Sequence, residues 1–167
     1  MTTFSLPVDQ EIILKLPDLS DAEKLFALVD RNRAFLKQYL PWVDDNVSVN
    51  DSKAFIEECR KQFQDLSGFS LCIVYQQQIV GVIGLHYIDK VNRKTEIGYW
   101  ISEEYQSKGI ILRSCLALIT YFFHTLKLHR VEIHCSVHNK ASQRIPEKLR
   151  FTKEGILREA TCLNGQF

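Results

Sequence analysis

The chain has 167 residues, with 21 Lys and Arg against 20 Asp and Glu, and 46% of its residues are apolar. This length and composition predict one domain over residues 1–167 and exclude intrinsic disorder and fibrous repeats. The formal net charge of +1 lacks the basic footprint of a nucleic-acid-binding domain, so we expect no nucleic acid partner.

No apolar stretch approaches the roughly 20 residues that a membrane span needs, and the first residues show no secretory signal. We therefore expect a cytoplasmic protein without a membrane partner. The five cysteines are scattered and form no Cys-x-x-Cys pair, which indicates reduced, buried side chains. The spacing His134-Cys135-x-x-His138 is the one metal-like pattern. It crosses the end of a predicted strand, where neighbouring side chains point to opposite faces, so no metal is expected.

The N-terminal part predicts a strand over residues 11–17, which Pro17 stops, and then three helices. Ser20 and Glu23 have the spacing of a capping box at the start of the first helix. The second helical stretch ends at Pro41 and Trp42, and the third covers residues 51–66.

From Gly68 onward, branched and aromatic residues predict three consecutive antiparallel strands over residues 69–75, 79–88 and 95–101. The first turn, Gln76-Gln77-Gln78, lacks Gly and Asn, so its register is only loosely predicted. The elements expected after these strands are a helix over 108–126, a strand over 130–136, a helix over 139–149 and a strand over 151–157. The fold class is therefore α+β, a mainly antiparallel mixed sheet flanked by helices.

A polar loop leads from the third of these strands to a helix that begins near Gly109. The first amides of a helix have no internal partner, and Gly lets the backbone approach a ligand, so such a loop can cradle a phosphate. Lys108 would add a point charge. The alternative is an ordinary helix start capped near Ser107. Neither Gly-x-x-x-x-Gly-Lys-Ser/Thr nor Gly-x-Gly-x-x-Gly occurs, which argues against an ordinary nucleotide site.

Four ordered segments together resemble the GNAT acyltransferases, and most of all the RimJ/RimL-type protein N-acetyltransferases. They are residues 96–101, 105–111, 139–142 and 146–155. Asp30-Arg-Asn-Arg33 and Leu40-Pro-Trp42 also look like that branch, so the resemblance covers residues 10–167.

The resemblance implies acetyl-CoA as the acetyl donor and a binding site on two segments. The family's phosphate-loop pattern, Gln/Arg-x-x-Gly-x-Gly/Ala, maps onto Gln106, Gly109 and Ile111, and Ile111 departs from the broad pattern. The pyrophosphate of coenzyme A would be held by the backbone amides of Ser107, Lys108, Gly109, Ile110, Ile111 and Leu112. Gln106 would also belong to the cofactor-binding site. In the family, the strand before the loop splays at a bulge and pairs with pantetheine. Here that strand is 95–102, with Trp100, Ile101 and Ser102 nearest the loop.

The resemblance also implies catalytic roles. Glu96 would accept the proton of the amine, or alternatively would only bind substrate. Asn139 would contact the cofactor and Ser142 would protonate the departing thiolate, although both also suit a helix cap. A second acid of some relatives aligns with Thr161, which cannot be a base, while Glu159 is near. No Ser-His-Asp or Cys-His arrangement is visible, so the amine would attack the thioester directly.

The function implied is an acetyl-CoA-dependent N-acetyltransferase acting on a primary amine, with a ribosomal protein N-terminus as the acceptor. The alternatives are a small-molecule amine acceptor, such as a polyamine, amino acid or antibiotic, or a non-catalytic acyl-CoA-binding module. The N-terminal helical region, residues 20–66, would border the acceptor side of the site. Within it, Trp42, Asp44 and Asp45 would line the groove for the acceptor, although core packing explains Trp42 equally well. Members of this branch are often dimers, so a homodimer is expected by analogy.

Three local departures carry further expectations. Pro146 cannot donate to the carbonyl of Ser142, so the last helix should kink there. Arg150 replaces a Gly usual in the family, and should be strained if this position is left-handed. Relatives continue beyond residues 164–167 into one more strand, so the final strand should be missing. This indicates a shortened or incompletely described chain, or a partner that covers the sheet edge.

Overall fold

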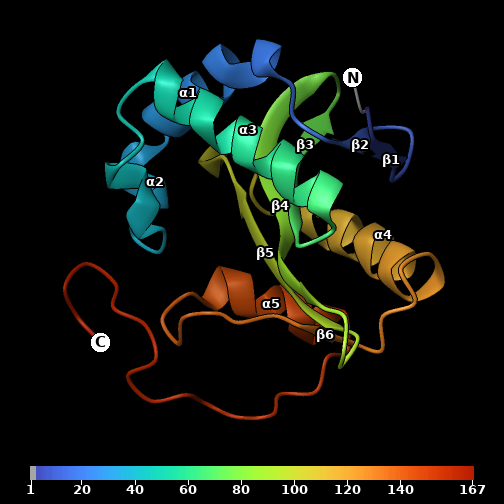
Figure 1. Ribbon diagram of the computed structural model, residues 1–167. Coiled ribbons are helices and arrows are strands. Elements are labelled where there is room, and N and C mark those ends of the chain that lie inside the picture. Colours follow the sequence, from blue (N-terminus) through green and yellow to red (C-terminus); the bar gives the residue numbers. More distant parts are fainter. Residues whose placement is uncertain (1–2) are drawn as a thin grey trace.

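The computed structural model describes residues 3–167, and it is built around one six-stranded sheet in the order β1-β2-β3-β4-β5-β6 (Figure 1). The strands are β1 (Ser5–Pro7), β2 (Ile12–Lys15), β3 (Phe69–Tyr75), β4 (Gln78–Asp89), β5 (Lys94–Ile101) and β6 (Arg130–Glu132). The helices are α1 (Ala22–Arg31), α2 (Arg33–Leu36), α3 (Val49–Asp65), α4 (Ile110–His124) and α5 (Lys140–Lys148), with 3-10 turns η1 (Leu19–Asp21), η2 (Pro41–Asp44) and η3 (Glu103–Tyr105).

The sheet is antiparallel from β1 to β5, and β6 joins it in parallel. This confirms the predicted fold class and the three consecutive strands. The hairpin between β3 and β4 closes on Tyr75 and Gln78. Its two central residues, Gln76 and Gln77, have φ of 48° and 67°. The chain therefore makes the left-handed two-residue turn that normally takes Asn-Gly, which explains why the sequence predicted its register poorly.

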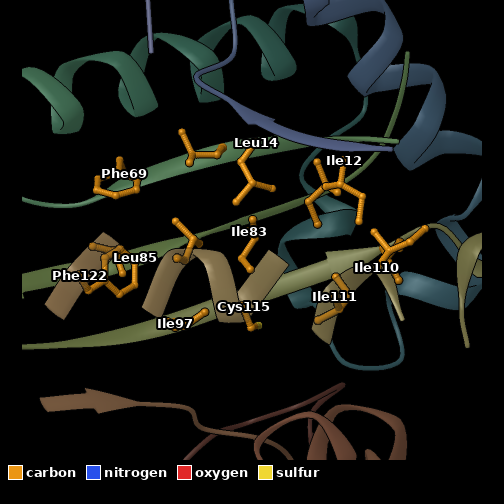
Figure 2. Close-up of a cluster of buried hydrophobic side chains, with 14 of the residues drawn as sticks. Ile12, Leu14, Phe69, Ile83, Leu85, Ile97, Ile110, Ile111, Cys115 and Phe122 are labelled. Atoms are coloured by element: carbon orange, nitrogen blue, oxygen red, sulfur yellow. The ribbon is translucent and has the colours of Figure 1, made fainter. Parts of the chain in front are cut away.

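Alternation along the strands sorts the core into two layers. Figure 2 shows side chains of the strands packed against side chains of α4. Cys115 and Phe122 come from α4, and Leu14, Ile83 and Ile97 come from β2, β4 and β5. Their neighbours along the strands point the other way, toward α1 and α3. Each sheet face is thus covered by different helices, and the two faces of β5 meet different surroundings.

The start of the first helix differs from the prediction. The capping box is formed by Asp18 and Asp21 rather than by Ser20 and Glu23. The Asp18 carboxylate accepts from the Ser20 amide at 3.1 Å, and Asp21 accepts from the Asp18 amide at 2.9 Å. The helical segment begins with the 3-10 turn η1, ahead of α1. The capping residue is therefore Asp18, two positions before the predicted Ser20.

The strand predicted over residues 151–157 is wrong. Within the described residues, the chain after α5 pairs only at the isolated bridge Leu163–Gln166, and Figure 1 shows it running away from the sheet. A strand needs ladder partners for its amides and carbonyls. Glu154 reaches Arg130, the first residue of β6, only through its side chain, while Ile156 and Leu157 are 59% and 72% exposed.

Arg150 is left-handed, with φ of 60°, as expected if the Gly usual at this position adopts that conformation. Because a side chain costs about 1 kcal/mol or more there, Arg150→Gly should raise the free energy of unfolding by about 1 kcal/mol, and Tm by roughly 2–4 °C for a chain of this size. Calorimetry measures both. Arg150→Ala keeps the Cβ and should bring no gain; an equal gain in that control would show that the arginine side chain, not the backbone, is responsible.

Candidate active site

The site forms where β5 and β6 separate. They pair only at Lys94–Arg130, Thr95–Val131 and Glu96–Glu132. Strand β6 then ends, four residues before the predicted boundary at residue 136, while β5 continues to Ile101. Beyond Glu96, the β5 edge facing β6 is therefore without a strand partner in the described chain. The one-residue register shift lies between β4 and β5, with the extra residue on β4 between Leu85 and Ile88, so the bulge expected near this strand is on its neighbour.

A hydroxyl cluster spans the gap on the side of β5 that faces α4. Tyr99 of β5 donates its hydroxyl to the carbonyl oxygen of Ser142 at 3.0 Å. The Ser142 hydroxyl donates to the Tyr99 oxygen at 3.2 Å, and the Cys135 sulfur lies 3.2 Å from Ser142 Oγ. Burial raises the pKa of the Tyr99 phenol far above its ordinary value, so it is a neutral donor at physiological pH.

Pro146 explains why the Ser142 carbonyl is available. Proline at position 146 has no N–H to donate four residues back, and Pro146 lies inside α5. The carbonyl that the proline leaves free is the one that accepts from Tyr99. The sequence predicted the free carbonyl but not its partner, because Tyr99 comes 43 residues earlier.

Asn139 caps α5, as the sequence allowed. Its side-chain oxygen accepts from the Ser142 amide at 3.0 Å, which fixes the start of the helix on which Ser142 lies. Gln143 adds a bond from its side-chain nitrogen to the Ser136 carbonyl at 2.8 Å. The loop after β6 and the first turn of α5 therefore hold each other in place.

The predicted phosphate loop has an open, left-handed backbone. Ser107 and Gly109 have φ of 62° and 72°, and nothing lies within 4 Å of the place a Cβ would take on Gly109. Arg113 donates its amide to the Gly109 carbonyl at 3.0 Å, which starts the helical series of α4. The amides of residues 110–112 precede that series and face the helix N-terminus, where the dipole favours an anion.

The side chains of the predicted binding residues mostly point elsewhere. Ile101, Ile110 and Ile111 are buried in the core against the sheet, and Leu112 and Gln106 are half-buried. Lys108 places its ammonium 4.6 Å from the centre of the Tyr105 ring, so its charge rests on an aromatic face. Any ligand held here is therefore held mainly by backbone amides.

A buried asparagine ties the loop to the N-terminal helices. Asn32, at the end of α1, accepts from the Ser102 hydroxyl at 3.1 Å and from the Glu103 amide at 3.0 Å. It donates to the Leu28 carbonyl at 2.8 Å. The Ser102 hydroxyl also lies 3.4 Å from a Glu104 carboxylate oxygen, so its hydrogen-bond partners are within the protein. Sequence analysis missed the structural role of Asn32, because only its place in the segment Asp30–Arg33 drew attention.

The opposite side of β5 carries a different chemistry. Alternation puts Glu96, Gly98 and Trp100 on the face toward α1 and α3, where Trp100 packs between those helices. The carboxylate oxygen Oε2 of Glu96 lies 3.5 Å from Nδ1 of His134. The His86 ring covers Gly98 so closely that a Cβ there would come within 2.3 Å of its Nε2.

The other acceptor-side candidates lie at the rim. Trp42 packs against Trp100 at a tilted angle of 50° with ring centres 5.9 Å apart and remains 38% exposed, so it both packs and presents a surface. Asp44 and Asp45 are exposed, with Asp44 3.7 Å from Lys37. Thr161 and Glu159 are exposed in the segment after α5.

The prediction of buried cysteines holds for three of the five, since Cys135 is half-buried and Cys162 is exposed. All five cysteines are free, and Cys59, Cys72 and Cys115 are buried, where burial raises the pKa of the Cys59 and Cys115 thiols to about 12. Residues 3–167 contain no group of His, Cys, Asp and Glu arranged to hold a metal ion. Across the same residues, no helix is long and apolar enough to span a membrane.

Comparison with known proteins decides the family. A model of the acetyltransferase (GNAT) domain matches residues 11–152. The chain belongs to the GNAT acetyltransferase family. This confirms the resemblance drawn from the motifs.

Three similar proteins illustrate the relationship. The YdaF protein of Bacillus subtilis (strain 168) is 38% identical over 163 residues, which cover 97% of this chain and 89% of that protein. The ribosomal-protein-serine acetyltransferase of Escherichia coli (strain K12) is 28% identical over 165 residues, covering 99% and 92%. A structure of RimL, a ribosomal L7/L12 alpha-N-protein acetyltransferase, superposes with a TM-score of 0.95 at 30% identity, covering 98% and 93%. It holds coenzyme A in a disulfide with a cysteine of that protein.

The bond between Tyr99 and Ser142 can be tested by stability. Tyr99→Phe should lower the free energy of unfolding by about 1–3 kcal/mol, because the buried Ser142 carbonyl loses its donor. Urea unfolding measures this. Tyr121→Phe is the matched control, since no hydrogen bond of the Tyr121 hydroxyl is found among the described residues. Equal losses in the two variants would contradict the assignment.

Proposed function

We propose that this acetyltransferase moves an acetyl group from acetyl-CoA to the α-amine of a protein N-terminus, with a ribosomal protein as the acceptor. The observation that carries the proposal is the open edge of β5, which has Glu96 on one face and the Tyr99–Ser142 cluster on the other. A thioester lying along this edge would meet the amine from one side and a proton donor from the other. The ribosomal-protein acetyltransferases among the relatives support this acceptor class.

The donor would bind through backbone groups at two places. The amides of residues 107–112 would hold the pyrophosphate, because they are uncompensated donors at a helix N-terminus. Gln106 and Asn139 would border this site, and the open edge at Trp100, Ile101 and Ser102 would pair with pantetheine as an added strand does. The predominance of backbone contacts accounts for Ile111 at a position where the broader family has Gly or Ala.

Direct attack by a neutral amine would follow. Glu96 would take the proton of the ammonium form. Its carboxylate lies on the sheet face toward α1 and α3, which is the face on which the acceptor is proposed to bind. A backbone N–H of β5 would meet the oxyanion of the tetrahedral intermediate. Ser142 would then donate its hydroxyl hydrogen to the departing thiolate, and it would regain one from the protonated nitrogen of the collapsing intermediate, so that both N–H protons are accounted for. Cys135 lies beside Ser142, where the thiol of coenzyme A would be released. In the RimL structure, coenzyme A forms a disulfide with a cysteine of that protein, which supports this placement of the thiol.

The activity is tested with acetyl-CoA and a panel of amines, comparing short peptides with free N-termini, the same peptides with blocked N-termini, and polyamines. We expect release of free coenzyme A thiol only with free N-termini. Mass spectrometry would locate the acetyl group on the α-amine. Calorimetric binding of acetyl-CoA without thiol release from any amine would instead indicate a non-catalytic acyl-CoA-binding protein. Homodimer formation is a separate proposal by analogy, which light scattering would test.

The loop proposal predicts the effect of a single methyl group. Gly109→Ala should weaken acetyl-CoA binding about 10- to 100-fold, because losing one hydrogen bond to a charged group costs about 1.5–3 kcal/mol. Titration calorimetry measures the affinity. Gly165→Ala is the control, since Gly165 is equally left-handed and open, with φ of 78°. An unchanged affinity in Gly109→Ala would place the phosphates elsewhere.

The base proposal predicts a separation of binding from turnover. Glu96→Gln should reduce kcat by about 10²- to 10⁴-fold, the usual contribution of a positioned base, while the acetyl-CoA affinity stays unchanged. Glu57→Gln on the exposed surface of α3 is the control and should retain full kcat. If Glu96→Gln turns over at the normal rate, Glu96 only lines the acceptor site.

A further inference from the structure

The pattern His134-Cys135-x-x-His138 places an imidazole where the proposed reaction needs an exit for a proton. His134 follows the end of β6, on the same face of the sheet as Glu96 and Glu132. Its Nδ1 is 3.5 Å from the Glu96 carboxylate, and its Nε2 is 3.8 Å from the Glu132 carboxylate. The ring thus lies between two acids at the point where β5 and β6 separate.

The exposure of the two side chains indicates the direction in which a proton would move, from Glu96 toward His134 and solvent. The Glu96 side chain is 21% exposed, whereas the His134 side chain is 55% exposed. A proton taken up by Glu96 is held at a sheltered carboxyl that must be emptied before the next turnover. The His134 ring lies beside this carboxyl and is more exposed, and a ring nitrogen of a neutral imidazole can accept a proton.

The second acid is occupied by other partners. Glu132 is bonded to Arg130 at 2.6 Å and lies 3.6 Å from the Lys94 ammonium. The Tyr87 hydroxyl donates to it at 3.4 Å, and the Arg130 bond is the largest cause of a lowered pKa at this carboxyl. Glu132 therefore stays an anion, which attracts a protonated His134 without competing for its proton.

We propose that His134 relays the proton of the acceptor amine from Glu96 to solvent, an inference that rests on the proposed function. The ammonium loses its proton to the Glu96 carboxylate, and the free amine attacks. The resulting carboxylic acid passes the proton to Nδ1 of the neutral imidazole, which restores the Glu96 anion. The imidazolium, stabilised by Glu132, then loses one proton to water or buffer, so no charge accumulates in the site.

Without the relay, turnover would depend on small bases in solution. His134→Gln should lower kcat about tenfold or more in dilute buffer of low basicity, with the acetyl-CoA affinity unchanged. Added imidazole should restore most of the lost kcat in this variant and leave the native enzyme nearly unaffected. His124→Gln, an exposed histidine at the end of α4, is the matched control and should show neither loss nor rescue.

The outcomes separate the relay from the function on which it rests. A normal kcat for His134→Gln in dilute buffer overturns the relay, and so does a loss that imidazole cannot restore, since that indicates a purely structural role. If Glu96→Gln keeps full turnover, both the base and the relay are overturned. If the native enzyme acetylates no amine, the proposed function itself fails. Imidazole rescue confined to His134→Gln supports the relay.

Discussion

The whole site depends on one constraint, which is that β5 and β6 remain paired for three positions and then part. Paired strands satisfy each other's backbone groups, so a strand that loses its neighbour presents donors and acceptors to whatever lies beside it. Here the open stretch of β5 runs from a carboxylate toward a loop of free amides. The separation therefore aligns three different chemistries, an acid, a strand edge and an anion site, along a single strand.

The gap remains structured because other bonds span it. Pro146 removes the helical partner of the Ser142 carbonyl, and Tyr99 supplies a replacement from β5. This links α5 to the strand that β6 has left, and it orients the Ser142 hydroxyl at the same time. On the opposite side, Asn32 joins the end of β5 to α1. A residue that weakens one helix thus contributes to the rigidity of the site.

Much of this architecture was predictable from local pattern. The period of the apolar residues indicated α3, α4 and the three central strands, and the motifs around Gln106, Gly109 and Asn139 indicated the family. What local pattern could not give were contacts between distant segments, such as Tyr99 with Ser142 and Asn32 with Ser102. The strand expected over 151–157 failed for the same reason, since its branched residues indicate a strand only if a neighbouring strand is present to pair with.

Amide hydrogen exchange measured with and without acetyl-CoA tests the central claim most directly. If pantetheine pairs with the open edge of β5, acetyl-CoA should slow exchange at amides within residues 97–102, and within 107–112 where the pyrophosphate is proposed to bind. Strands β2 and β3, which already have partners on both sides, should change little. Protection confined to the loop, or spread evenly over the sheet, would contradict the claim that the separated strand holds the donor.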